Sequence, residues 1–139
     1  MEDKDVVITS AFRTAIGSFN GTLSSKTGPE LGSTVIKKCV EHSELKPEEV
    51  DTVYMGQVLT TGAGQNPARQ ASILAGLSND TTNTTINQVC GSGLASVALA
   101  YNSIKSGDGK VILAGGQESM SNSPHYINIR KGIKMAMAV

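Results

Sequence analysis

The chain has 139 residues with 12 basic and 12 acidic side chains, so its formal net charge at pH 7 is zero. This balance gives no electrostatic reason to expect binding to nucleic acid or to an anionic membrane. No stretch approaches the roughly 18 apolar residues of a membrane-spanning helix, and the acidic start MEDKD is unlike an Arg-rich organelle presequence. We therefore expect a cytoplasmic protein of one domain, with neither a nucleic-acid nor a membrane partner.

The predicted elements alternate between strand and helix along the chain. Four short β-rich runs are predicted strands: residues 6–11, 52–58, 84–89 and 111–115. Three helices are predicted between them: one beginning at Pro29, one from Pro67 to about Ala75, and one from Gly91 to about Ser106. Strands separated by helices form parallel crossover units. The expected fold is α/β in the order βαβαβαβ, with a mixed, mainly parallel sheet and helices on both faces.

The predicted helix over residues 91–106 differs from the other two, because its apolar side chains cover most of its circumference. Polar residues occur only at intervals, among them Ser96 and Asn102. A helix that is apolar on all sides is normally buried on all sides, whereas one sheet covers only one of its faces. We expect a second layer of protein over this helix, from another subunit or from further chain, with residues 84–89 near a subunit interface.

The segment NQVCGSGL places Cys90 between a predicted strand and a predicted helix. The free N–H groups and the dipole of a helix start favour negative charge, which suits a nucleophilic thiolate. Gly91, Ser92 and Gly93 form the supporting loop, and its glycines leave room for a substrate to approach. The alternative is that Cys90 is an inert buried cysteine, as many are. The residues by themselves support the two interpretations about equally.

Other chemistries have weaker support in the sequence. The chain has four Cys and His residues: Cys39, His42, Cys90 and His125. Only the pair Cys39 and His42 has a plausible ligand spacing, so no metal site is expected. Cys39 is predicted to be a small core residue on the apolar face of the first helix, with Leu31, Val35 and Val40. Residues 62–64 (GAG) lack the remainder of a nucleotide-binding loop, and the chain has no GxSxG motif of serine hydrolases.

Four stretches resemble the thiolases, enzymes that make or cleave a carbon–carbon bond between acyl groups carried on coenzyme A. In chain order these are VVITSAFRTAIGSFNGTL, GQNPARQASILAGL, NQVCGSGLASVALA and VILAGGQESMSNSPH. The resemblance implies one half-domain of the thiolase-like fold, incomplete, with residues 1–118 carrying the nucleophile and residues 119–139 beginning an inserted loop region. It also implies that Cys90 is the nucleophile that holds the acyl group as a thioester, with its backbone N–H as an oxyanion donor.

The activity that the resemblance implies is an acyltransferase that condenses two acetyl-CoA molecules to acetoacetyl-CoA and catalyses the reverse thiolysis. Coenzyme A thioesters would be the substrates, no further cofactor or metal is expected, and the protein would be a homodimer or homotetramer. The histidine base, second cysteine and asparagine of thiolases belong to their second half, so full turnover is not expected of these 139 residues alone.

Two alternatives remain beside this activity: a non-catalytic thiolase-like module that binds acyl chains or a partner, and a condensing enzyme of the ketoacyl-synthase group. The segment NQVCGSG, in place of a serine-rich segment, favours a thiolase over a synthase. The residues that bind substrate are not identified by the sequence.

Overall fold

The structure is a computed structural model that describes residues 5–127. Its elements follow one another as α1 (Gly28–His42), β1 (Thr52–Gly56), α2 (Pro67–Leu74), β2 (Thr82–Ile86), α3 (Ser92–Ser106) and β3 (Ile112–Gly116). Two short 3₁₀ helices, η1 (Pro47–Glu49) and η2 (Met120–Asn122), follow α1 and β3. The predicted inserted loop region, residues 119–139, lies outside the described residues from residue 128 onward.

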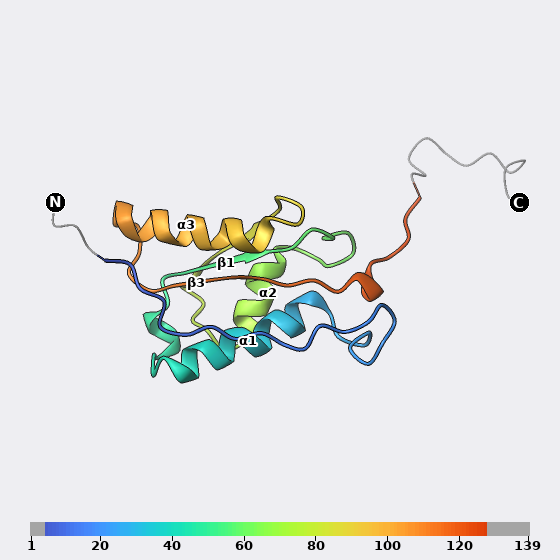
Figure 1. The fold of residues 1–139 in the computed structure, drawn as a ribbon, viewed down its shortest axis with the longest axis horizontal. Coiled ribbons are helices and arrows are strands. Elements are labelled where there is room, and N and C mark those ends of the chain that lie inside the picture. Colours follow the sequence, from blue (N-terminus) through green and yellow to red (C-terminus); the bar gives the residue numbers. More distant parts are fainter. Residues whose placement is uncertain (1–4, 128–139) are drawn as a thin grey trace, which may run out of the picture.

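The sheet of the described chain has three parallel strands in the order β2–β1–β3. The central strand β1 pairs with both neighbours in register, so that Gly56 lies beside Ile86 on one side and Gly116 on the other. Figure 1 shows α3 on one face of this sheet and α1 with α2 on the other face. The predicted α/β fold with helices on both faces is confirmed. The three carboxyl ends meet at one edge, so the segments that follow them are neighbours in space.

The main apolar core lies between the sheet and the layer formed by α1 and α2. Val53 and Met55 point from the central strand into this layer and are fully buried. On α1 the buried face runs through Gly32, Ile36 and Val40, at helical spacing of four residues. Three side chains predicted to be on this face are only half-buried at its margin: Leu31, Val35 and Cys39.

Gly32 sets the orientation of α1 against α2. This explains why the buried face of α1 differs from the predicted one. A Cβ atom on Gly32 would fall on the side chain of Gln117 and 3.3 Å from the Cβ of Ala71 in α2. Only a glycine lets α1 approach α2 and the end of β3 this closely. Cys39 was predicted to be a core residue, but its side chain is only half-buried and lies at the margin of the core.

The predicted strand over residues 6–11 is not part of the sheet, so the predicted order of four strands was wrong for the described chain. Val7 and Ile8 are 72% and 79% exposed. This segment contacts the end of α1, where the hydroxyl of Ser10 donates to the carbonyl of Cys39 at 3.3 Å. Residues that are common in strands favour a pleated, half-buried surface. A strand of a sheet also needs a neighbouring strand to form hydrogen bonds with its backbone N–H and C=O groups.

The third predicted strand is shifted: β2 ends at Ile86, whereas the prediction extended to Val89. The shift arises because Asn87 begins a turn that leads into α3. Within residues 5–127 no helix is long and apolar enough to cross a membrane.

Candidate active site

The turn between β2 and α3 carries Cys90. The side-chain oxygen of Asn87 accepts a hydrogen bond from the N–H of Val89 at 3.0 Å. The hydroxyl of Ser92 accepts from the N–H of Gln88 at 2.9 Å and donates to the carbonyl of Val89 at 2.6 Å. Val89 has a φ of 52°, in the left-handed region that β-branched residues rarely adopt. Two polar side chains thus restrain a strained turn, and Cys90 lies within this turn.

The helix α3 begins directly after this turn, with Gly91 as its N-cap residue. Its buried side chains are the small residues Ser92, Ser96 and Ala100, which let the helix lie close to the sheet. The Ser96 hydroxyl is within hydrogen-bond distance of the carbonyls of Gly93 (2.6 Å) and Gly115 (2.8 Å). The amino-terminal part of α3 therefore contacts the carboxyl end of β3 through Ser96, and Cys90 lies two residues before the helix begins.

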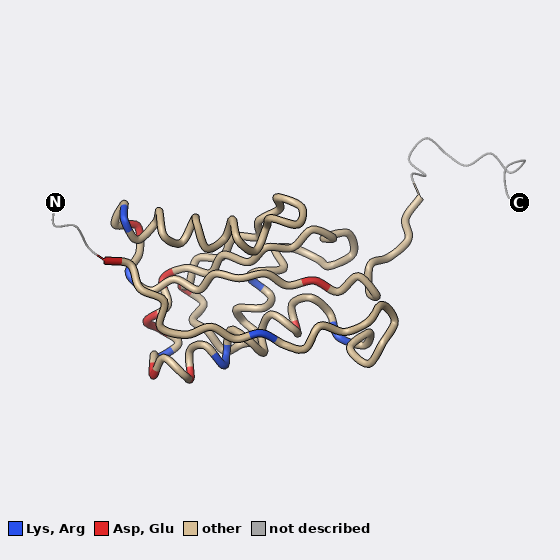
Figure 2. Tube along the Cα trace, in the orientation of Figure 1, with Lys and Arg blue, Asp and Glu red and all other residues tan. Residues whose placement is uncertain are grey.

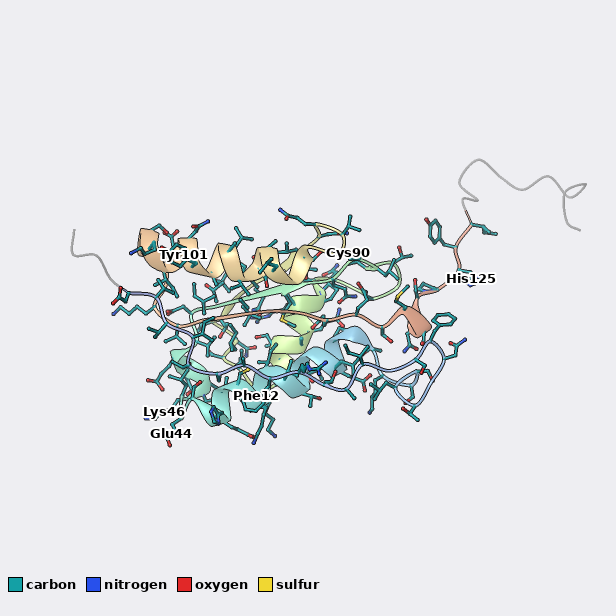
Figure 3. All side chains as sticks on the ribbon, in the orientation of Figure 1. Phe12, Glu44, Lys46, Cys90, Tyr101 and His125 are labelled. Atoms are coloured by element: carbon teal, nitrogen blue, oxygen red, sulfur yellow. The ribbon has the colours of Figure 1, made fainter. Side chains whose placement is uncertain are left out.

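Cys90 is exposed, so the alternative of an inert buried cysteine does not hold in this structure. It lines a hollow of about 330 Å³ at the carboxyl edge of the sheet. The other lining residues come from the ends of β1 and β3 and from the start of α3: Gly56, Gln57, Val58, Val89, Ser92, Gly93, Gly116, Gln117 and Glu118. Figure 3 shows Cys90 at the start of α3, on the outside of the fold. Gly91, Ser92 and Gly93 follow Cys90 directly in the chain, and Ser92 and Gly93 also line the hollow.

Two side chains that follow β3 connect the strand ends below this hollow. The amide of Gln117 is buried and donates to the side-chain oxygen of Gln57 at 2.9 Å and to the carbonyl of Pro67 at 3.1 Å. The carboxylate of Glu118 accepts hydrogen bonds from the backbone N–H groups of Val58 at 2.8 Å and Leu59 at 3.3 Å. Gln117 and Glu118 were not among the predicted site residues, although polar residues directly after a buried parallel strand are a usable signal.

The two histidines do not reach Cys90. The ring of His42 contacts Phe12 edge-on, with centroids 5.2 Å apart, at the far end of α1. Figure 3 shows His125 in the segment after η2, well apart from Cys90. Within residues 5–127 no group of three or more His, Cys, Asp or Glu side chains could hold a metal ion. The described site therefore presents an exposed thiol, and neither histidine is placed beside it.

A second, larger hollow of about 550 Å³ lies at the same edge of the sheet, beside the start of α2. Polar side chains line it, including Asn66, Asn83 and Asn87. Asn87 begins the turn that contains Cys90, so the two hollows flank this turn.

The fold and the site together define an α/β half-domain that presents an exposed cysteine at a helix entrance. The model of the family described as "Thiolase, N-terminal domain" matches residues 6–139. The acetyl-CoA acetyltransferase of Cupriavidus necator is 55% identical over 135 residues, which are 96% of this chain and 34% of that protein. The cytosolic acetyl-CoA acetyltransferase of Rattus norvegicus is 51% identical over 130 residues, which are 94% of this chain and 33% of that protein.

A solved structure agrees with the sequence comparisons. The Acat5 thiolase of Ascaris suum, crystallised in complex with coenzyme A, is similar with a TM-score of 0.91 and 39% sequence identity. The similarity covers 95% of this chain and 34% of that one. This chain belongs to the thiolase family, and it spans about a third of the length of the curated relatives it matches.

Proposed function

We propose that this chain carries the nucleophile half of an acyltransferase that condenses two acetyl-CoA molecules to acetoacetyl-CoA and catalyses the reverse thiolysis. The observation that carries the proposal is the exposed thiol of Cys90 at the entrance of α3, beside the hollow at the sheet edge. The proposal is supported by relatives whose names state acetyl-CoA acetyltransferase activity, and by a structural neighbour solved with coenzyme A.

In the proposed first half-reaction, the sulfur of Cys90 attacks the carbonyl carbon of acetyl-CoA. A new carbon–sulfur bond forms, the bond to the coenzyme A sulfur breaks, and coenzyme A leaves with the proton that Cys90 loses. The N–H of Cys90 is our candidate donor to the oxyanion of the tetrahedral intermediate. In the second half-reaction, the α-carbon of another acetyl-CoA, once deprotonated, attacks the acetyl group and releases the cysteine.

The proposed second half-reaction needs an acid–base group for the α-carbon. Such a group typically contributes about 10²–10⁴-fold to the rate. Neither His42 nor His125 is placed for this role. We therefore propose that residues 1–118 form the nucleophile-carrying half-domain, that residues 119–139 begin an inserted region, and that the base lies in other parts of a thiolase. Coenzyme A thioesters are the proposed substrates, with no additional cofactor.

We also propose that the protein is a cytoplasmic homodimer or homotetramer. The outer face of α3 supports a subunit contact there, because Leu94 is 78% and Tyr101 is 50% exposed. Figure 2 shows α3 without charged residues from its start to Lys105, near its carboxyl end. An apolar face of this kind is typical of a surface that binds another protein.

The activity is tested with the purified 139-residue chain, free of host thiolase, and its Cys90→Ala variant. After mixing with acetyl-CoA, mass spectrometry of the Cys90 peptide is expected to show slow acetylation in the wild type and none in the variant. Acetoacetyl-CoA cleavage, assayed beside a complete thiolase, is expected to be absent. If the chain cleaves acetoacetyl-CoA near the rate of the complete enzyme, and this cleavage depends on Cys90, the proposal that the base lies in other parts of a thiolase is contradicted. No acetylation of Cys90 would instead favour a non-catalytic module.

The identity of the reactive thiol has a test of its own. Brief alkylation with iodoacetamide, followed by peptide mapping, is expected to label Cys90 before Cys39. Cys90 is exposed at a helix entrance, whereas Cys39 is half-buried on α1. Faster labelling of Cys39 in the folded chain would contradict the assignment of the nucleophile.

A further inference from the structure

The peptide unit between Val58 and Leu59 lies between two polar side chains from different parts of the chain. On one side the N–H of Leu59 donates to the carboxylate of Glu118 at 3.3 Å, and the N–H of Val58 donates to the same carboxylate at 2.8 Å. On the other side the carbonyl of Val58 accepts from the side-chain amide of Asn87 at 3.2 Å. This peptide therefore joins Glu118, the second residue after β3, to Asn87, the first residue after β2.

The same Asn87 side chain continues this connection to the turn that contains Cys90. Its amide nitrogen donates a hydrogen bond to the Val58 carbonyl, and its side-chain oxygen accepts one from the N–H of Val89 at 3.0 Å. Val89 is the residue with the strained left-handed backbone, and it immediately precedes Cys90. An unusual backbone conformation persists only where the surroundings determine it, and here Asn87 and Ser92 supply that restraint.

The Glu118 carboxylate is oriented by these two backbone contacts. Its two oxygens accept from two successive backbone N–H groups, and an ionised acceptor makes such bonds roughly twice as strong as a neutral one. Hydrogen bonds in series also polarise one another, so removing the carboxylate weakens the bond from Asn87 to the Val58 carbonyl.

We propose that Glu118 is a positioning residue for Cys90, acting through the Val58–Leu59 peptide and the side chain of Asn87. The inference rests on the proposed role of Cys90 as the nucleophile. Cys90 is already exposed, so a looser turn gives it no better access to reagents. What the turn supplies is a fixed position of the thiol at the entrance of α3, beside the hollow that the thiol lines. Loss of Glu118 therefore lowers the reactivity of Cys90.

The test compares Glu118→Ala, Asn87→Ala and the double variant in the 139-residue chain. Iodoacetamide labelling of Cys90 is measured relative to Cys39 in the same molecule. Each single variant is expected to lower this ratio by about fivefold, the factor that corresponds to one net hydrogen bond. The double variant is expected to lower it no further, because both changes interrupt the same chain of contacts. Glu41→Ala is the matched control, since its carboxylate pairs with Lys38 on the outer surface of α1, and it leaves the ratio unchanged.

Backbone amide exchange separates positioning from a loss of global stability. Glu118→Ala is expected to accelerate exchange at Val58 and Val89 while leaving the buried central residue Val53 protected. If Glu118→Ala does not fold, Glu118→Gln replaces it, with an expected decrease in the labelling ratio of about twofold because one of two acceptor oxygens is lost.

An unchanged Cys90 to Cys39 ratio in the folded Glu118 variant would overturn the proposal. The proposal would also be overturned if the decreases in labelling ratio of the two single variants multiply in the double variant. It would likewise be overturned if amide exchange accelerates equally at Val53 and Val89. Acetylation by acetyl-CoA is followed separately in the wild type. Its absence would contradict the proposed function, while the labelling and exchange data would still decide the role of Glu118.

Discussion

Gly56, the last residue of β1, is in backbone contact with Ser92, the first residue of α3. A Cβ atom on Gly56 would lie 2.6 Å from both the Cβ and the carbonyl carbon of Ser92, and 2.8 Å from the nitrogen of Gly93. No real Cβ occupies such positions, so only glycine allows this approach. The contact places the start of α3 against the central strand of the sheet (Figure 1), and Cys90 and Gly56 line the same hollow.

The first prediction follows from this contact. Gly56→Ala forces the first turn of α3 away from β1 and is expected to lower the free energy of unfolding by about 1–3 kcal/mol, as overpacking typically does. The measurement is urea unfolding followed by circular dichroism. Gly109→Ala is the control, with an expected change within about 0.5 kcal/mol, because its nearest neighbours are the side chains of Ile112 and Asp51 at 3.3 Å and beyond. Equal effects at the two glycines would contradict the interpretation.

The second prediction concerns the strained turn. Val89→Gly removes a cost of about 1–2 kcal/mol for an L-residue in the left-handed region, against roughly 0.4–1 kcal/mol of added chain entropy in the unfolded state. Val89 is 64% exposed, so little buried surface is lost. We expect the free energy of unfolding to rise by about 0.5–1 kcal/mol in urea titrations. Val7→Gly, at a similarly exposed valine that is not among the positive-φ residues, is expected to give no gain. Destabilisation by Val89→Gly would mean that the turn is not strained.

The third prediction is a pH dependence at Asp51. Its carboxylate accepts from the N–H groups of Val111 at 3.0 Å and Lys110 at 2.7 Å, and these bonds hold the pKa of Asp51 below its ordinary value. Because the pKa of Asp51 is lower in the folded state, these hydrogen bonds stabilise the fold fully above the ordinary pKa of the carboxyl group. This stabilisation is lost as the pH falls through the folded-state pKa.

Asp51→Asn tests this dependence. We expect it to lower the free energy of unfolding at pH 7 by roughly 0.5–1 kcal/mol, a modest loss because the group is exposed to solvent. The difference from the wild type is expected to shrink as the pH falls below the folded pKa, as measured by urea unfolding across the acid range. Asp80→Asn serves as the exposed control. A difference that stays constant down to the lowest pH would count against the assignment.

The fourth prediction concerns the outer face of α3. If this face is a subunit interface, Leu94→Glu and Val97→Glu introduce buried charge into it and are expected to shift the protein toward monomer. Sedimentation velocity at several concentrations measures the shift. The control is Leu74→Glu at the end of α2, where the leucine is 59% exposed on the other side of the sheet. A wild-type chain that sediments as a monomer at all concentrations would contradict the proposed interface.

Local sequence patterns predicted most of the elements correctly, because these depend on neighbouring residues. The start of α2 at Pro67 agrees with the structure, and the start of α3 agrees to within one residue. The strand–cysteine–glycine–helix order around Cys90 also agrees, since a turn and a helix start are written in consecutive residues. The apolar circumference of α3 correctly indicated a face that the described sheet does not cover.

The tertiary structure decided what depends on distant parts of the chain. Residues 6–11 have the composition of a strand, yet their backbone has no place in the described sheet, because pairing depends on a neighbour that composition does not reveal. The buried face of α1 is set by close packing at Gly32. Glu118 and Asn87 are 31 positions apart in the sequence, and they act on one peptide only because β2 and β3 flank β1 in register. The sequence contains the cysteine, its turn and the neighbouring side chains of Asn87 and Ser92, while the fold brings Glu118 to the peptide that Asn87 contacts.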